Sequence, residues 1–91
     1  MSRKSLIYTR DIRTWTEDPV HLEYYLLNDA LLDGCAECYG VEVRAHCRAG
    51  TQYAGVHGVT TVGSRILELL DTLAREQIMP AQLYEAVRAW S

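Results

Sequence analysis

The last third of the chain, residues 60–90, constrains the fold most, because it predicts two amphipathic helices separated at Pro80. The first helix is expected to begin near Thr60 or Thr61, since either residue suits an N-cap. Proline fits the first turn of a new helix and disrupts a helix interior. Apolar residues recur at helical spacing on both sides of it: Ile66, Leu67, Leu69, Leu70, Leu73 and Ala74, then Leu83, Tyr84, Val87 and Trp90. We therefore expect a helical hairpin that turns back at residues 77–80.

Four segments before the hairpin are expected to be strands: residues 5–13, 20–28, 39–48 and 53–60. The third is the clearest, since apolar and polar residues alternate there with the period of two typical of a half-buried sheet. In this pattern Cys47 shares a face with Val43 and Ala45, so we expect it to point into the core. In the fourth segment, Gly55 and Gly58 predict a bulge or a close backbone approach.

Strands followed by a helical hairpin predict an α+β fold. We expect a three- to four-stranded antiparallel β-meander, with the C-terminal helical hairpin packed on one face of the sheet. Residues 1–18 are expected to form an N-terminal arm or an edge strand, and residues 19–91 a single α+β domain. The predicted core joins the apolar helix positions to the inward-facing residues of the strands.

The chain has 91 residues and a formal net charge of −3 at pH 7, and 48% of its residues are hydrophobic. Such a composition is typical of a folded globular domain rather than a disordered chain. The negative charge argues against nucleic acid as a partner, and no apolar run approaches the roughly 20 residues that cross a membrane. Charged residues follow the N-terminus too soon for a signal peptide. We therefore expect a cytoplasmic protein with reduced cysteines.

Three short motifs resemble a family of small bacterial proteins, mostly clostridial, that is known only as a domain of unknown function. The motifs are Glu23-Tyr24-Tyr25-Leu26, Tyr39-Gly40-Val41 and Pro80-x-x-Leu83-Tyr84-x-x-Val87, and the resemblance covers roughly residues 20–90. The last helix of the family tends to carry an acidic residue near its end, where this chain has Arg88-Ala89-Trp90. The resemblance implies a bacterial cytosolic protein, and it implies no activity, cofactor or functional residue.

Cys35 and Cys38 form a Cys-x-x-Cys pair whose spacing is typical of a zinc knuckle. Cys47, with His46 or His57, would complete a tetrahedral set of ligands. A second Cys-x-x-Cys or Cys-x-x-His pair is missing, so ordinary packing is the simpler interpretation, and a structural zinc-binding module is the alternative. A redox role is disfavoured, because the pair precedes a strand and not a helix, whose N-terminus would lower a thiol pKa.

No complete catalytic constellation appears in the sequence, and we expect neither catalytic residues nor a cofactor. His21, His46 and His57 have no nucleophile at a spacing that implies catalysis. Residues 58–64 resemble a phosphate-binding loop, but Ser64 stands where such a loop requires lysine. A small enzyme or ligand-binding domain that uses residues 57–64 is therefore a third alternative.

Six tyrosines and two tryptophans, with no phenylalanine, make an unusual aromatic set. Tyr24, Tyr39 and Tyr84 are expected at the rim of the core. Four other aromatic residues are harder to bury, namely Tyr8, Trp15, Tyr25 and Tyr53, and tyrosine and tryptophan are enriched at protein interfaces. The expected interaction surface comprises Tyr8, Trp15, Tyr25, Leu27 and Tyr53. The principal hypothesis is a small non-enzymatic interaction or regulatory protein, which binds a protein partner or forms a homodimer through an open strand edge.

Overall fold

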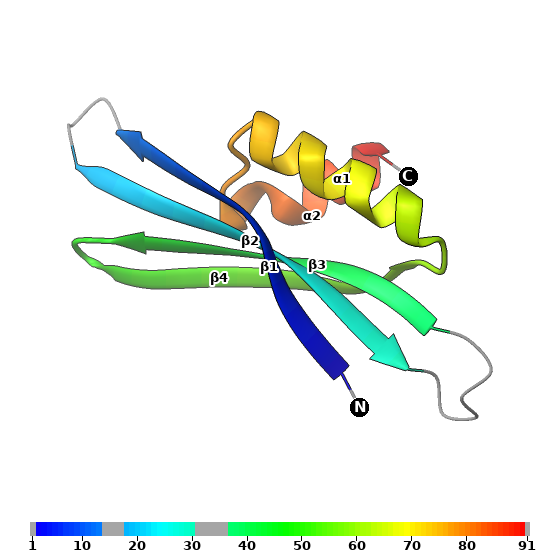
Figure 1. The fold of residues 1–91 in the computed structure, drawn as a ribbon. Coiled ribbons are helices and arrows are strands. Elements are labelled where there is room, and N and C mark those ends of the chain that lie inside the picture. The colour runs from blue at the N-terminus through cyan, green and yellow to red at the C-terminus, as the bar shows by residue number, and fades with distance from the viewer. Residues whose placement is uncertain (1, 14–17, 31–36, 91) are drawn as a thin grey trace.

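The computed structural model describes residues 2–13, 18–30 and 37–90. Figure 1 shows four long strands in one sheet and two helices on the same side of it. The elements are β1 (Ser2–Arg13), β2 (Pro19–Ala30), β3 (Glu37–Cys47), β4 (Gly50–Thr60), α1 (Gly63–Arg75), a 3₁₀ turn η1 (Pro80–Gln82) and α2 (Leu83–Trp90). Among the described residues, no helix has the length and apolar character that crossing a membrane requires.

The strands lie in the order β1-β2-β3-β4, and each strand is antiparallel to its neighbours. This meander, followed by two helices, confirms the predicted α+β fold and settles the number of strands at four within the described residues. The first segment is an edge strand, because β1 pairs with β2 from Ser2 to Arg13 with one bulge between Leu6 and Tyr8. Strands of eleven or twelve residues give the molecule its elongated shape, 48 × 24 × 18 Å.

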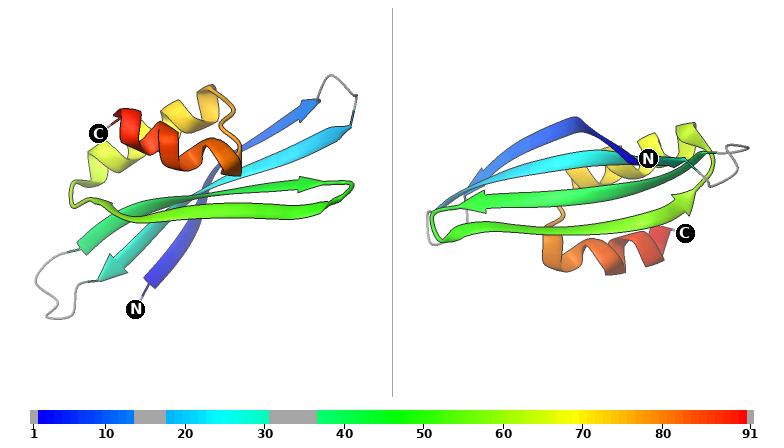
Figure 2. Two further views of the ribbon diagram at one scale, coloured as in Figure 1. Left: turned by 180° about the vertical axis from the view of Figure 1, so that it is seen from behind. Right: turned by 90° about the horizontal axis from the view of Figure 1, so that it is seen from below.

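Both helices pack on one side of the sheet, here called the core face (Figure 2). The period-two alternation of β2 and β3 places every second residue on this face. The buried core contains Val20, Leu22, Tyr24, Val41, Val43 and Ala45 from the sheet and Ile66, Leu69, Leu70, Leu73, Ala74, Leu83 and Val87 from the helices. Burial of one large aliphatic side chain contributes about 1.5–3 kcal/mol, so this layer is the main source of the protein's stability.

Tyr24 in β2 forms a hydrogen bond with the segment that connects the two helices. Its side chain is fully buried, and its hydroxyl donates a hydrogen bond to the carbonyl oxygen of Ile78 at 3.1 Å. Burial raises the pKa of Tyr24 to about 12, so the hydroxyl remains a neutral donor at physiological pH. The prediction that Tyr24 lies at the rim of the core therefore understates its burial.

The rim position is confirmed for Tyr39, which is partly buried against the core, and is wrong for Tyr84, which is 63% exposed. The buried face of α2 is set by Leu83 and Val87. These two residues are four apart and lie on the same side of the helix, whereas Tyr84 is rotated about 100° from Leu83. Tyr84 is therefore a surface residue.

Helix α1 begins at Gly63, later than the expected start near Thr60 or Thr61. Val62 is the N-cap and makes no side-chain capping bond. Thr60 stabilises the preceding turn instead, because its Oγ1 accepts a hydrogen bond from the Val62 N–H at 3.1 Å. The threonine thus acts on the turn between the strand and the helix, and not on the helix terminus.

Strand β4 contains a bulge in which residues 57–59 lie opposite Gly40 alone. Gly58 has a φ of 66°, a left-handed conformation that glycine adopts without steric strain. A Cβ atom on Gly40 would collide with the carbonyl oxygen of Val56 and would lie 2.9 Å from the Cα of His57. The predicted bulge is confirmed at Gly58, and the close backbone approach lies on the neighbouring strand at Gly40.

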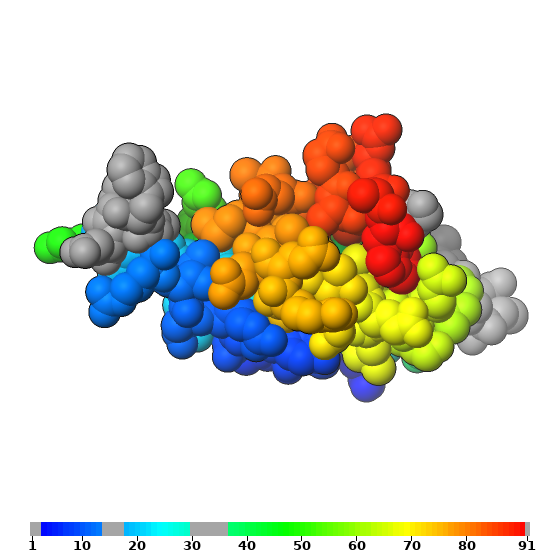
Figure 3. Space-filling view, turned by 90° about the horizontal axis from the view of Figure 1, so that it is seen from above, coloured from blue at the N-terminus to red at the C-terminus, as the bar shows by residue number. Residues whose placement is uncertain are grey.

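Cys47 lies on the core face, paired with Val20, but it is exposed. The prediction that it points into the core is therefore wrong. Figure 3 shows the reason: the helices cover the middle of the sheet, and the strands project beyond them at one end. The alternation of side chains along β3 determines the face on which Cys47 lies, but burial also requires a helix above the residue.

Candidate functional site

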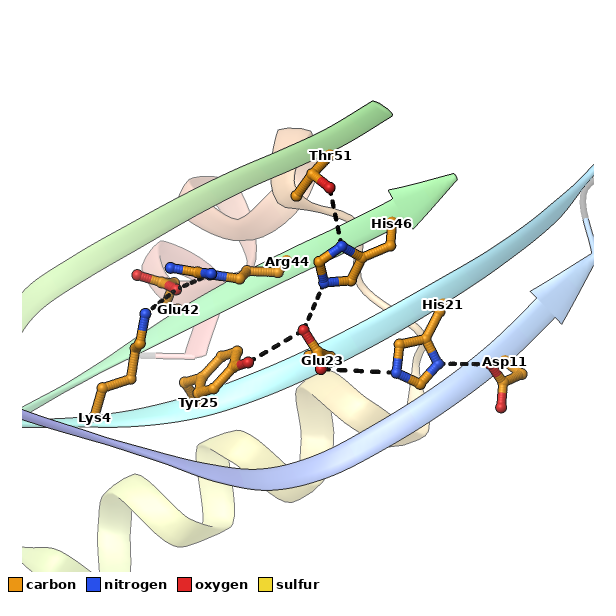
Figure 4. Close-up of polar contacts among 9 residues, drawn as sticks. All are labelled: Lys4, Asp11, His21, Glu23, Tyr25, Glu42, Arg44, His46 and Thr51. Carbon is orange, nitrogen blue, oxygen red and sulfur yellow. Dashed lines mark hydrogen bonds and ion pairs between the residues drawn. The ribbon is translucent and has the colours of Figure 1, made fainter. Parts of the chain in front are cut away.

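The sheet face opposite the helices, here called the open face, carries a group of polar side chains that come from all four strands (Figure 4). None of the described elements packs across it (Figure 2). Direct cross-strand pairing arranges its side chains in rows from β1 to β4: Asp11–His21–His46–Thr51, then Thr9–Glu23–Arg44–Tyr53, then Leu6–Tyr25–Glu42–Gly55. Side chains directly opposite each other lie about 5 Å apart, so each row can form a line of contacts.

Three hydrogen bonds and one longer ion-pair contact connect the first row across the whole sheet. Asp11 Oδ1 lies 2.6 Å from His21 Nδ1, and His46 Nδ1 lies 2.9 Å from Thr51 Oγ1. Glu23 joins the two halves, with Oε1 at 2.6 Å from His46 Nε2 and Oε2 at 3.8 Å from His21 Nε2. The result is a continuous polar chain with contributions from all four strands.

Within this chain, hydrogen bonds favour the charged forms of His21 and Glu23. The hydrogen bond that His21 donates to the Asp11 carboxylate raises the pKa of His21 above its ordinary value of 6.5. The hydrogen bond from His46 lowers the pKa of Glu23. The side chain of His21 is 40% exposed, so water and salt screen the interaction and keep its contribution small.

Thr51, His46 and Glu23 follow the order hydroxyl, imidazole, carboxylate that a catalytic triad also has. Their surroundings are different, because Thr51 is exposed and the His46 side chain is 39% exposed. Nucleophilic catalysis depends on a site that excludes water and stabilises developing charge. The contacts that the structure shows here are charge-assisted hydrogen bonds between strands.

Arg44 is the centre of a second cluster, next to the first. Its guanidinium carbon lies 5.5 Å from the ring centroid of Tyr25 and 5.6 Å from that of Tyr53, both within range of a cation–π contact. Its Nε donates to Glu42 Oε2 at 2.6 Å, and the hydrogen bond raises the pKa of Arg44. Lys4 Nζ reaches the same carboxylate oxygen at 3.4 Å and lies 5.0 Å from the Tyr25 centroid. Arg44 is therefore held in place by two rings and a carboxylate.

The structure separates the residues of the predicted interaction surface. Tyr25 and Tyr53 lie together on the open face, and Tyr53 is 69% exposed. Tyr8 pairs with Tyr24 and packs against the core from the helix side. Trp15 lies outside the described residues.

Leu27 was predicted as part of that surface, and this prediction is wrong, because the side chain is 5% exposed. Leu27 pairs with Gly40, over which the β4 bulge crosses. From this bulge His57 reaches Asp29, with Nδ1 and Oδ2 2.7 Å apart. Asp29 is two residues from Leu27 on the same face, so the bulge shelters Leu27 from solvent.

The candidate zinc ligands do not gather at one place: Cys38 lies beside the β4 bulge, where its Sγ is 3.8 Å from the position of a Cβ on Gly58, whereas Cys47 ends β3. Cys38 and Cys47 lie near opposite ends of β3, roughly 30 Å apart at the rise of an extended strand, so they cannot share one ion. Cys35 lies outside the described residues, and His57 is engaged by Asp29. Within the described ranges, no group of three histidine, cysteine or acidic side chains gathers as a metal site would require.

Sequence reasoning missed the carboxylate partners of the histidines, namely Asp11, Glu23 and Asp29. The available signal was the strand register, because Asp11 and His21 are direct cross-strand partners. That register depends on where the turn between the two strands falls, which the alternation pattern does not specify.

Comparison of the chain with curated proteins and with solved structures gives no match. A family model does match, over residues 3–91, and is described as a family of unknown function. The matched range contains β2 to β4, both helices and nearly all of β1. The resemblance to a family known only as a domain of unknown function is thereby confirmed. The chain belongs to the family of unknown function DUF6514.

Proposed function

We propose that this protein is a small non-enzymatic interaction protein, which binds a protein partner or a second copy of itself through its sheet. The observation that carries the proposal is the position of Arg44 between the rings of Tyr25 and Tyr53 on the open face. Tyrosine and arginine are among the residues that most often dominate binding energy at protein interfaces. Because contacts on the protein itself orient Arg44, a partner would meet it with little further loss of side-chain entropy.

The charges of the open face favour a protein as the partner. The cations Lys4 and Arg44 both contact Glu42, and the same face carries the carboxylates of Asp11 and Glu23 beside the histidines. A nucleic acid would require a predominantly basic surface, whereas a protein surface can offer complementary groups of both signs.

We further propose that the protein works in the cytoplasm of a bacterium. The free thiols of Cys38 and Cys47 support a reducing compartment. The zinc alternative has no comparable support, because these two cysteines lie at opposite ends of one strand.

Site-specific photo-crosslinking tests the proposal. A photoreactive phenylalanine analogue replaces Tyr53 on the open face in one variant and Leu67 on α1 in another; both positions are exposed, at 69% and 47%. We expect crosslinks to protein at position 53, whether to a second copy or to another protein, and few at position 67. The absence of crosslinks at position 53, or equal yields at both positions, would contradict the proposal. The mass of the intact protein, purified without chelator, tests bound zinc in the same preparation.

A further inference from the structure

We propose that the outer edge of β4 is the docking site for a second copy of this chain, through antiparallel pairing of β4 with β4 about a two-fold axis at Tyr53. The inference rests on the proposed function and names the partner. The product would be one continuous sheet of eight strands, four from each copy, with all helices on one face.

The two edges of the sheet differ in charge. Edge strand β1 carries five charged residues among its twelve, namely Arg3, Lys4, Arg10, Asp11 and Arg13, and is interrupted by a bulge. Edge strand β4 contains no aspartate, glutamate, lysine or arginine. Charges and bulges are the devices by which natural sheets prevent edge-to-edge pairing. By this criterion β1 is protected against pairing, and the first part of β4 is not.

The regular part of β4 suits pairing with itself. It runs from Gly50 to Val56, ahead of the bulge at residues 57–59, and Tyr53 is its middle residue. An antiparallel pair centred on Tyr53 therefore matches this segment with its own copy along its full length. Because the segment is uncharged, no like charges meet across the axis.

The helix side of the same edge has room for a neighbouring strand. In the right-hand view of Figure 2, α2 extends past β4 on the helix side of the sheet, beginning at η1. A shallow hollow lies between η1 and β4, and it is lined by Thr51, Gln52, Tyr53, Ala54, Pro80 and Ala81. Gln52 and Ala54 lie on the core face, opposite Ala45 and Val43. The same side chains of a paired copy would point toward this hollow.

A second copy fits this edge better than a flexible peptide does. An unstructured segment loses conformational entropy when it is ordered as a strand, whereas β4 of a second copy is already held in register by β3. The two-fold arrangement also ends with a single pairing, because it uses the unprotected edge of both copies and leaves a protected β1 on each side. Growth into a fibre is thereby prevented.

The expected dimer is weak, because each chain already has a complete buried core. The proposed interface consists of one backbone ladder between two strand segments, with further contacts from Tyr53 and η1. Its buried area is therefore small among specific interfaces. We therefore expect a concentration-dependent dimer with a Kd in the micromolar range, and not an obligate one.

A charge-swap experiment locates the axis. In the proposed dimer, position 53 of one copy faces position 53 of the other, so both Tyr53→Lys and Tyr53→Glu should abolish the dimer through like-charge repulsion. An equimolar mixture of the two variants should form a heterodimer. The matched control is Thr9→Lys, which adds a lysine to the same row at the opposite edge and should leave the dimer intact. Native mass spectrometry over a concentration series measures all four samples.

Each outcome is decisive for the edge. A monomeric wild-type chain at about 100 μM, well above a micromolar Kd, would overturn the inference. Dimers of Tyr53→Lys and Tyr53→Glu that persist unchanged would overturn it too, as would a mixture that stays monomeric. In each of these cases, a crosslink from position 53 to a different protein would leave the proposed function standing. Loss of that crosslink as well would remove both.

Discussion

The two faces of the sheet differ in burial and in the contacts that their side chains make. Tyr24 and Tyr25 are neighbours in β2, yet Tyr24 is fully buried and donates to the Ile78 carbonyl oxygen. Tyr25 points to the open face, donates to Glu23 at 3.1 Å and stacks beside Arg44. The same residue type thus stabilises the fold on one face and orients a cation on the other. Stability and binding can therefore be altered separately, by substituting alternate residues of one strand.

The largest difference between the faces is expected from a pair of adjacent substitutions in β2. Leu22→Ala removes a fully buried side chain from the core face and should lower the free energy of unfolding by about 2–5 kcal/mol. Glu23→Gln, one residue along on the open face, should cost about 1 kcal/mol, since it weakens charge-assisted hydrogen bonds without leaving a cavity. Urea denaturation measures both values, and equal losses would show that the open face is not the less critical layer.

The second effect concerns one position of the open face that behaves like core. Gly40→Ala places a Cβ against the Val56 carbonyl oxygen, so the bulge must shift, at an expected cost of about 1–3 kcal/mol. The matched control is Gly55→Ala, whose Cβ would meet its nearest atom, the Val41 carbonyl oxygen, at 3.6 Å. The control should be near neutral or slightly stabilising. Thermal unfolding of the two variants gives the comparison, and a neutral Gly40→Ala would contradict the close approach.

A smaller effect is the pH dependence of the polar chain. The pKa of His21 is raised in the folded protein, so its stabilisation is fully present below about pH 6.5 and is lost as the pH rises through the folded value. The pKa of Glu23 is lowered, so its contribution is present above its ordinary value of 4.5 and is lost as the pH falls. Together the two groups should favour the folded state most between these values. Asp11→Asn should flatten the alkaline side of this profile, and an unchanged slope in denaturation at pH 6 and pH 8.5 would contradict the assignment.

The smallest expected effect on stability is that of Tyr53→Ala. The side chain is 69% exposed, so the free energy of unfolding should change by no more than about 0.5 kcal/mol. The same substitution should weaken association, since it removes one of the two rings beside Arg44. Denaturation and native mass spectrometry on one sample separate the two properties. A large loss of stability with unchanged association would reverse the roles assigned to the two faces.

Patterns local to the sequence were reliable where a periodicity or a backbone constraint dictated structure. Alternation predicted the face of every second residue of β3, and Pro80 marked the start of the second helical segment. The glycines predicted the bulge, because Gly58 adopts a left-handed conformation. The family resemblance was also available from short motifs, and it now extends over residues 3–91.

Burial was predicted less well for residues near the ends of the strands. The alternation along the strands places Cys47 on the core face, yet it is exposed. It places Leu27 on the open face, yet it is buried. In both cases elements distant in the sequence decide burial: the helices cover only the middle of the sheet, and the β4 bulge crosses beside Leu27. Parity assigns a residue to a face, but only the neighbouring elements determine whether that face is covered.

The sequence by itself determined the fold class, the alternation of the strands and the break between the helices. Each of these depends on residues that are close together in the sequence. Only the tertiary structure decided which polar residues meet. The row Asp11–His21–His46–Thr51 joins residues from four strands, and the contrast between a charged β1 edge and an uncharged β4 edge acquires meaning only once both are known to be edges. The physical reason is that strand order and register arise from packing between distant segments, which no local pattern contains.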